Sequence, residues 1–373
     1  MTVPPASAIA PRTANAAADA AAPLTFRRWR LGCSAVAESG TEAGTEAGTE
    51  AGTETGLGGR RFGAADAVPM ELLAPDAAVF DAWSGGAAAV EHEHGSVRYA
   101  TDGHWLHGCA TIDDARFEGG LQAASRQAYA ELFAVLAASA SPHLLRLWNH
   151  FTDMNVETGG TERYRQFNAG RQQAFTDAGR SAFVGAPAAC ALGTSSGPLQ
   201  VYFLAGPQPP LAIENPRQVS AYDYPACYGA RSPTFSRAAL AAVGGARQAL
   251  FISGTASIVG HETLHLGDVR RQAEESLANI AAVLGAADVH DTAAGHDTAA
   301  PRAAAPWALQ ALTCTVYIRH AADFAAVREV FERVVGAHSA AAREAVYLRA
   351  DICRADLLVE IEAHGFMPNG SPT

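Results

Sequence analysis

Residues 248–259, QALFISGTASIV, and residues 267–284, GDVRRQAEESLANIAAVL, decide the fold of this chain. The first stretch is rich in β-branched and aromatic residues, which favour a strand. In the second, Asp268 is a good N-cap residue, and apolar residues from Val269 to Leu284 recur every three or four positions, as on the buried face of a helix. The two stretches predict a strand that leads through a short turn into an amphipathic helix.

The alternation of elements continues towards the C-terminus. Residues 309–320 predict a strand, Asp323 opens a second amphipathic helix that runs through Val334, and residues 344–350 and 356–363 predict two more strands. The order strand-helix-strand-helix-strand-strand is typical of an α/β (α+β) fold, in which helices pack on one face of a mixed sheet.

The middle of the chain predicts a similar order. Its expected elements are a strand in 102–113, a helix at about 119–139, a strand at 144–151, a helix in 161–179 and two strands within 182–206. We therefore predict two similarly built halves, each a mixed sheet with helices on one face. The prediction rests on element order, because the halves share no sequence identity that would support it.

Composition limits the possible classes of protein. The 373 residues suit two ordinary domains, and the 49% that are apolar can bury a sizeable core. The formal net charge of −11 argues against a nucleic-acid-binding protein, which needs a basic surface. Six cysteines without a C-x-x-C pair predict reduced thiols. The first residues resemble neither a signal peptide nor a membrane span, so we expect a cytoplasmic protein that does not bind membranes.

Three segments are of low complexity. Residues 1–24 are rich in Ala and Pro and predict a disordered N-terminus, whereas 40–56 repeat GTEA and 288–303 contain a duplicated HDTAA, which we interpret as loop insertions. The predicted domains are an N-terminal half at 25–206, a connecting segment at 207–245, a C-terminal half at 246–366 and a tail at 367–373.

Two short motifs match known signatures without their required context. His261–His265, HETLH, matches the zinc-peptidase pattern H-E-x-x-H, which needs both histidines one turn apart on a helix. Here five residues lie between a strand and the turn at Gly267, too few for a stable helix, so we predict a strand-to-helix loop. The run GLGG at 56–59 follows the GTEA repeats and does not link a strand to a helix, as a phosphate-binding loop would. We expect no metal and no cofactor.

Longer motifs carry a family resemblance. Residues 248–365 resemble the RidA/YjgF fold, through Q-x-x-x-S-L-x-N on the first helix and a closing E-I-E-A strand. Five runs within about 140–365 resemble the chorismatase family: GPLQVYFLAG (197–206), ENPRQVSAY (214–222), YPACYGARSPTFSRA (224–238), FISGTASIVGHET (251–263) and CRADLLVEIEA (353–363). The resemblance implies two RidA-like halves, an active site in the cleft between them, and cleavage of chorismate to pyruvate and a ring product without a cofactor.

Cleavage of an enol ether requires a general acid. Protonation of the vinyl carbon gives an oxocarbenium ion, which water or a ring hydroxyl then captures. A carboxyl on an apolar strand stays protonated near neutral pH, because desolvation raises its pKa. Glu360 and Glu362 lie two residues apart, hence on one face of their predicted strand, so spacing alone does not choose between them. The family resemblance favours Glu360.

The resemblance also implies a site for the two carboxylates of chorismate. Arg217 and Arg231 lie in the family motifs, and Arg163 opens the helix of the N-terminal half. Arginine forks suit carboxylates, and Tyr228 can donate a hydrogen bond to a carboxylate or a ring hydroxyl.

Two positions bear on the ring product. Cys353 resembles the members that form 3-hydroxybenzoate, alone or mixed with 4-hydroxybenzoate, and as a free thiol it can face the ring. Ala256 resembles the members that hydrolyse chorismate to a dihydroxycyclohexadiene carboxylate, and it would act through its small size. We favour 3-hydroxybenzoate and keep the diene as the alternative.

Two functions of other classes remain open. One is a RidA-type imine deaminase, and the other is a protein that binds an aromatic acid without turnover. In the favoured interpretation the partner is the small molecule chorismate, and the chain is a monomer or a small homo-oligomer, because an internal duplication can replace an interface between subunits.

Overall fold

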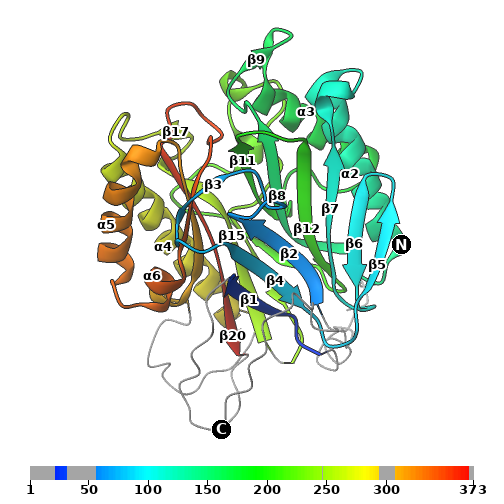
Figure 1. The fold of residues 1–373 in the computed structure, drawn as a ribbon, viewed down its shortest axis with the longest axis horizontal. Helices are drawn as coiled ribbons and strands as arrows, with labels where there is room; N and C mark the ends of the chain where they lie inside the picture. Colours follow the sequence, from blue (N-terminus) through cyan, green and yellow to red (C-terminus); the bar gives the residue numbers. More distant parts are fainter. Residues whose placement is uncertain (1–21, 32–55, 246, 294–306, 369–373) are drawn as a thin grey trace, which may run out of the picture.

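The computed structural model describes residues 22–31, 56–245, 247–293 and 307–368 (Figure 1). Most of the predicted N-terminal disorder, most of both predicted insertions and the end of the tail lie outside the described residues. Leu24 is fully buried, and its amide donates to the Val243 carbonyl at 2.8 Å. The packed part of the chain therefore begins before residue 25, where the predicted N-terminal half started.

A seven-stranded mixed sheet forms the base of the C-terminal half, in the order β13-β14-β15-β20-β18-β19-β3. Its strands are β13 (Leu211–Ile213), β14 (Ala238–Ala242), β15 (Arg247–Ala256), β18 (Thr313–Ile318), β19 (Val346–Arg349), β20 (Val359–Pro368) and β3 (Glu71–Ala74). β13 and β14 come from the segment predicted as a connection, and β3 comes from the N-terminal half. The sheet therefore draws strands from across the predicted domain boundaries.

A six-stranded mixed sheet forms the N-terminal half, in the order β11-β8-β12-β7-β6-β5. Its strands are β5 (Val90–His94), β6 (Val97–Thr101), β7 (Leu106–Ile112), β8 (His143–Thr152), β11 (Ala188–Thr194) and β12 (Leu199–Gly206). The four strands from β7 onwards overlap the strands predicted from the sequence.

The two sheets have the same topology. When the strands of each half are numbered along the chain, and β3 is left aside, both sheets have the spatial order 1-2-3-6-4-5. In both, the fourth and fifth strands pair in parallel, as β8 with β11 and as β18 with β19. Helices follow the third and the fourth strand in each half. The predicted fold class, α/β (α+β) with two similarly built halves, is confirmed.

Helices cover the outer face of each sheet (Figure 1). They are α2 (Gly120–Ala138) and α3 (Arg163–Asp177) in the N-terminal half, and α4 (Val269–Ala293), α5 (Phe324–Val335) and α6 (Ala340–Glu344) in the C-terminal half. Phe133 and Phe175 pack with Phe203 in one outer core, and Leu277 packs with Ile361 in the other. Each sheet therefore has its own apolar core between its outer face and the helices that cover it.

The start of α4 agrees with the predicted cap. Asp268 Oδ1 accepts a hydrogen bond from the Arg271 amide at 3.1 Å, which satisfies one of the free N–H groups of the first turn. At its other end α4 runs on to Ala293, into the segment predicted as an insertion.

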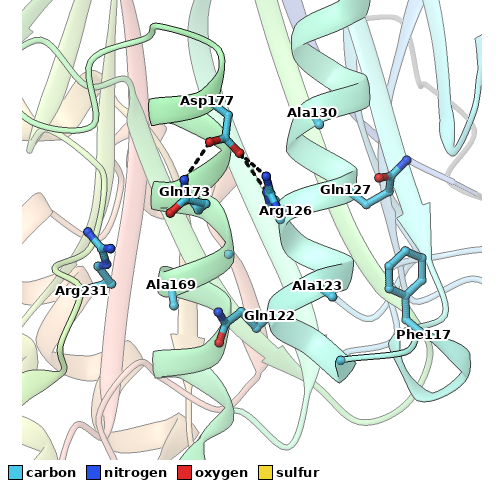
Figure 2. A pocket seen from close by; sticks show the side chains of 12 residues that line it. Phe117, Gln122, Ala123, Arg126, Gln127, Ala130, Ala169, Gln173, Asp177 and Arg231 are labelled. Carbon is cyan, nitrogen blue, oxygen red and sulfur yellow. Dashed lines mark hydrogen bonds and ion pairs between the residues drawn. The ribbon is translucent and has the colours of Figure 1, made fainter.

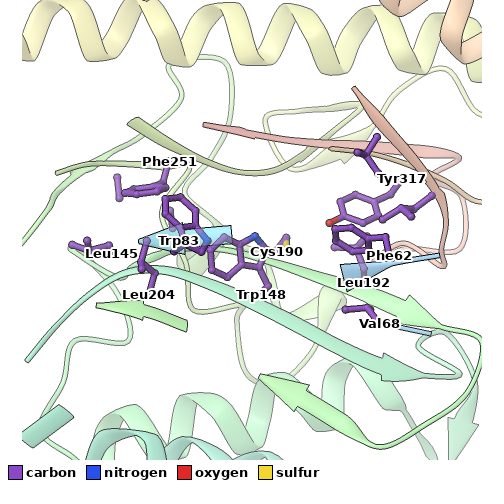
Figure 3. Packing of buried hydrophobic residues seen from close by; sticks show 14 of the residues in the cluster. Phe62, Val68, Trp83, Leu145, Trp148, Cys190, Leu192, Leu204, Phe251 and Tyr317 are labelled. Carbon is purple, nitrogen blue, oxygen red and sulfur yellow. The ribbon is translucent and has the colours of Figure 1, made fainter. Parts of the chain in front are cut away.

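The inner faces of the two sheets share a third core. A small sheet of β1 (Thr25–Arg30), β4 (Val79–Ser84) and β2 (Gly56–Phe62), in the order β1-β4-β2, packs into it. The Trp83 ring of β4 lies 6.3 Å from Trp148 of β8 and 5.9 Å from Phe251 of β15, centroid to centroid (Figure 3). The small sheet thus joins the two large ones.

Short elements complete the fold. In the described ranges they are the hairpins β9 (Glu157–Thr158) with β10 (Thr161–Glu162) and β16 (Ile258–Val259) with β17 (Glu262–Thr263), and short 3₁₀ turns at Asp114–Arg116, Ala221–Asp223, Ala226–Tyr228, Leu309–Ala311 and Ala321–Asp323. Over the ranges that the structure describes, none of the helices combines the length and the apolar character that crossing a membrane requires.

Candidate active site

Glu360 lies where the two halves meet. It is on β20, opposite Ala256 of β15, and is only 4% exposed. Its carboxyl lies against Gly254, where an added Cβ would stand 1.8 Å from Glu360 Oε1 and 3.1 Å from the Cβ of Cys190. Cys190 belongs to β11, the edge strand of the N-terminal sheet. Both halves therefore contribute to the surroundings of this carboxyl.

Backbone contacts fasten the halves together beside Glu360. The Gly193 amide of β11 donates to the Asp351 carbonyl at 2.8 Å, and the Asp351 amide donates back at 3.3 Å. The Ala189 amide donates to Ser253 Oγ at 2.9 Å. The edge of one sheet is thus held against the inner face of the other.

The environment of Glu360 favours its neutral form. Burial raises the pKa of Glu360 to about 8, and the charge of Glu362 adds to this rise. Within the described residues, its carboxyl has no hydrogen-bond or ion-pair partner. A carboxyl that is protonated at neutral pH and free of partners can give its proton to a bound substrate.

Glu362 has the opposite environment. Its carboxylate accepts hydrogen bonds from four neighbours, which are Arg60 Nη2 at 2.9 Å, Arg146 Nη2 at 2.7 Å, the Tyr317 hydroxyl at 2.9 Å and Cys190 Sγ at 3.2 Å. Burial alone would raise the pKa of Glu362, but Arg60 and Arg146 hold it well below its usual range. Glu362 is therefore ionised. The contrast favours Glu360 as the acid, a choice that the spacing left open.

Cys353 and Ala256 both lie beside Glu360. Ala256 is its partner in the β15–β20 pairing and is 5% exposed. Cys353, in the loop between β19 and β20, contacts the central core and the N-terminal core. Burial raises the pKa of its thiol to about 12, and the charge of Glu360 adds to this rise. Tyr164 of α3 joins the cluster, since burial and then Cys353 raise the pKa of its phenol.

Two arginines near this cluster keep N–H groups without partners. Arg354 stacks on Tyr228, with its Cζ 4.0 Å from the ring centroid, and its Nη1 donates to the His261 carbonyl at 2.9 Å. Arg237 donates to the Tyr224 hydroxyl at 2.8 Å. Among the described residues, Nη2 of Arg354 and Nε of Arg237 are buried without an acceptor. Each of these N–H groups could donate to a carboxylate.

The three arginines predicted from the sequence have other partners. Arg163 pairs with Asp114 at 2.9 Å. Arg217 pairs with Glu275 and also donates to Asn279 Oδ1 at 2.8 Å. Since Asn279 donates to the Ala256 carbonyl at 3.1 Å, Arg217 is linked indirectly to the Glu360 cluster.

Arg231 lies elsewhere, on a groove of about 930 Å³ between α2 and α3 (Figure 2). Its Nη1 donates to Gln172 Oε1 at 3.2 Å. An ion pair between Arg126 and Asp177 bridges the two helices across this groove. The groove residues do not include Glu360 or Cys353, so this groove and the candidate acid are separate.

The HETLH motif lies on the hairpin of β16 and β17 and in the turn that follows, ahead of α4, as predicted. His261 Nδ1 lies 3.3 Å from the Tyr228 hydroxyl, and His265 Nε2 lies 3.4 Å from Glu275 Oε2. Within the described ranges, no three His, Cys, Asp or Glu side chains group as metal ligands. His261 therefore takes part in placing Tyr228.

Sequence reasoning missed several residues of this cluster. Arg237 and Arg354 lie inside the quoted runs 224–238 and 353–363, so a search of those runs for every arginine would have found them. Arg319 had no such signal. Its guanidinium donates to the carbonyls of Ile352, Arg354 and Leu357, at 2.8 to 3.0 Å, and so holds the loop that carries Cys353.

Comparison with known proteins agrees with this architecture. Residues 81–205 match the family model "Chorismatase FkbO/Hyg5-like, N-terminal", and residues 233–366 match "Endoribonuclease L-PSP". A 3-hydroxybenzoate synthase of Streptomyces hygroscopicus is 36% identical over 303 residues, which are 79% of this chain and 83% of that protein. A chorismatase of Streptomyces rapamycinicus is 35% identical over 293 residues, 77% of this chain and 82% of that one.

A solved structure shows the same arrangement. The crystal structure of a chorismatase superposes with a TM-score of 0.74 at 28% identity, covering 92% of this chain and 99% of that chain. The superposition covers both halves of the chain. The chain belongs to the chorismatase family, and its C-terminal half is of the L-PSP (RidA-like) type.

Proposed function

We propose that this protein is a chorismatase that cleaves chorismate to pyruvate and 3-hydroxybenzoate, with Glu360 as the general acid. The observation that carries the proposal is the buried carboxyl of Glu360, which is kept neutral at the junction of the halves and has no partner among the described residues. The named activities of the relatives support the same substrate.

The proton of Glu360 would go to the methylene carbon of the enolpyruvyl group. The electron pair of the vinyl double bond forms the new C–H bond, and the adjacent carbon becomes an oxocarbenium ion. Capture by water, with loss of a proton, gives a hemiketal; a proton returns to the ring oxygen, the hemiketal C–O bond breaks, and pyruvate leaves with the dihydroxy diene. This diene gives 3-hydroxybenzoate only if the ring then loses one water. Capture by the ring hydroxyl instead gives a cyclic ketal, in which one ketal C–O bond and one ring C–O bond break, so that one ring oxygen leaves as the carbonyl oxygen of pyruvate and loss of a ring C–H proton gives the aromatic ring.

Arg354 and Arg237 are our candidates for the substrate carboxylates, because each has a buried N–H group without an acceptor among the described residues. Tyr228 supports Arg354 through its ring and can itself donate to the substrate. Of the arginines expected from the sequence, Arg217 would act through Asn279 on the wall of the site. Arg163 and Arg231 would have structural roles, in line with their present partners.

The ring product depends on the groups that flank Glu360. The neutral thiol of Cys353 would face the ring and guide the loss of its oxygen, and the small Ala256 leaves room for the ring. The relative named 3-hydroxybenzoate synthase favours the aromatic product. The diene, or a mixture with 4-hydroxybenzoate, is the alternative. A cytoplasmic location and a monomeric or small oligomeric state stay predictions.

Product analysis tests this function directly. Purified protein is incubated with chorismate without added metal, and the products are separated by chromatography while pyruvate is measured. Pyruvate with 3-hydroxybenzoate is expected. Pyruvate with a non-aromatic diene would keep the enzyme class and change the product. Chorismate recovered intact would contradict the proposal and favour a binding protein or an imine deaminase.

A further inference from the structure

Glu360 and Glu362 are both buried on the inner side of β20, where the two halves meet. They project from the same face of β20, because side chains two residues apart in a strand point the same way. Both are only 4% exposed, and their Cα atoms are about 7 Å apart along the strand. Cys190 lies near both carboxyls. Its Sγ donates to Glu362 Oε2 at 3.2 Å, and its Cβ would lie 3.1 Å from a Cβ added at Gly254, the position against which Glu360 Oε1 packs.

Side chains from the small sheet and from both large sheets stabilise the negative charge of Glu362. Arg60 comes from β2 of the small sheet, Arg146 from β8 of the N-terminal sheet and Tyr317 from β18 of the C-terminal sheet. The two arginines are 4% and 2% exposed. A carboxylate with this many charged and polar donors stays ionised even when buried.

We propose that Glu362 is a positioning residue for the reaction: held as a carboxylate by Arg60 and Arg146, it keeps the neighbouring Glu360 carboxyl protonated until the substrate arrives. The inference rests on the proposed role of Glu360 as the acid. Ionising Glu360 beside Glu362 would place two like charges in one compartment of low dielectric constant, which is unfavourable.

Among the charges that act most strongly on Glu360, Glu362 is negative and the others are positive. The opposing charges are Arg146, Arg237 and Arg319. The neutral groups are Cys190, Cys353 and Tyr164, whose pKa values burial raises. Glu362 is thus the negative charge that balances the arginines around Glu360. Without it, the remaining charges would favour the ionised form of Glu360.

The variant Glu362→Gln tests the inference. It keeps the shape of the side chain and removes its charge, so the pH at which Glu360 titrates should fall by about one unit or more. Two measurements report this pH. One is the alkaline limb of kcat/KM for chorismate, and the other is the infrared C=O band of a protonated carboxyl, assigned to Glu360 by its absence in Glu360→Gln.

A second variant, Arg146→Met, tests the same inference if Glu362→Gln does not fold. Arg146→Met removes one positive charge while Arg60, Tyr317 and Cys190 still hold Glu362, so the Glu360 midpoint should rise. The double variant Glu362→Gln/Arg146→Met loses one negative and one positive charge, so the net charge of the cluster is unchanged. It should fold better than Glu362→Gln alone, and the pH midpoint of Glu360 should lie between those of the two single variants. A merely structural role would lower the melting temperature without opposite shifts.

The outcomes separate this inference from the proposed function. A folded Glu362→Gln, or a folded Arg146→Met, whose infrared midpoint equals that of the parent protein overturns the inference while leaving Glu360 as the acid. Retained turnover in Glu360→Gln overturns the role of Glu360 as the acid, whereas intact chorismate with the parent protein overturns the proposed function. Opposite shifts in the two variants support Glu362 as the group that sets the protonation of Glu360.

Discussion

One carboxyl oxygen of Glu360 takes up the space that a side chain at Gly254 would need: an added Cβ would lie 1.8 Å from it. Gly254 stands in the middle of the Ser-Gly-Thr run of β15, next to the strand that carries Glu360. The lack of a side chain at Gly254 therefore makes room for the carboxyl of the candidate acid.

Gly254→Ala should displace the Glu360 side chain and reduce kcat by about 10²-fold or more, the lower range for losing a general acid. Steady-state kinetics on chorismate measures this. Gly285→Ala is the matched control, because Gly285 lies in α4 with nothing within 4 Å of an added Cβ. Equal activity of the Gly254→Ala variant and the parent would mean that the acid lies elsewhere.

Glu360→Gln should abolish pyruvate release, by about 10²- to 10⁴-fold, while the melting temperature stays close to that of the parent. A buried neutral carboxyl and an amide have nearly the same shape and polarity, so the fold should tolerate the change. Glu329→Gln serves as control, since Glu329 makes a surface ion pair with Arg270, a class of interaction that contributes little to stability. Turnover that survives in Glu360→Gln would argue for a different acid.

Activity should be highest below pH 8 and fall above it. The pKa of Glu360, raised by burial to about 8, leaves the active protonated form in place at neutral pH. Above that value kcat/KM should fall about tenfold per unit, as for a single essential acid. The same shift affects folding: Glu360 contributes stability fully below its ordinary value of 4.5, and this contribution is lost as pH rises through about 8. A profile that is flat from pH 7 to 10 would speak against this assignment.

Cys353→Ala should change the product more than the rate. With the thiol gone, we expect pyruvate release to persist while the ratio of 3-hydroxybenzoate to diene falls, as measured by chromatography. Cys109→Ala is the control, because Cys109 lies on β7, away from the Glu360 cluster. An unchanged product ratio would limit Cys353 to packing.

Arg354→Met should raise KM for chorismate by about tenfold or more and affect kcat less, because a carboxylate fork binds substrate and transition state alike. Arg231→Met provides the contrast, since Arg231 lies on the groove between α2 and α3. If instead KM rises only in Arg231→Met, the substrate lies in that groove.

How far the sequence predicts this molecule depends on the kind of residue. Strong periodicity predicted β15, α4, β18, α5 and β20, because one face of each meets a core. The run at 56–59 predicted no strand, yet it begins β2: a Cβ at Gly59 would lie 1.8 Å from the Asp81 carbonyl oxygen, so close pairing with β4 requires glycine. Local pattern does not reveal a glycine needed for a distant strand.

In the candidate site, too, local features could be predicted from the sequence and long-range contacts could not. Glu360 and Glu362 could be placed on one face of a strand, but their different charge states depend on Arg60 and Arg146, about 300 and 216 residues away along the chain. Two of the predicted arginines were chosen from motifs and Arg163 from the start of a helix, and all three interact with other side chains instead. Which arginine keeps a free N–H group is decided by packing between the halves.

The common topology of the two sheets has a consequence for how the halves divide their work. The strand of the N-terminal sheet that corresponds to β20 is β12, and its sequence LQVYFLAG contains no carboxyl. The repeated topology thus carries the candidate proton donor once, in the C-terminal half. The N-terminal half instead contributes Cys190 and Tyr164 to the surroundings of Glu360, and Gly193 to the backbone hydrogen bonds between the halves. The two halves therefore share a topology but contribute differently: the C-terminal half carries the candidate acid, and the N-terminal half helps to enclose it.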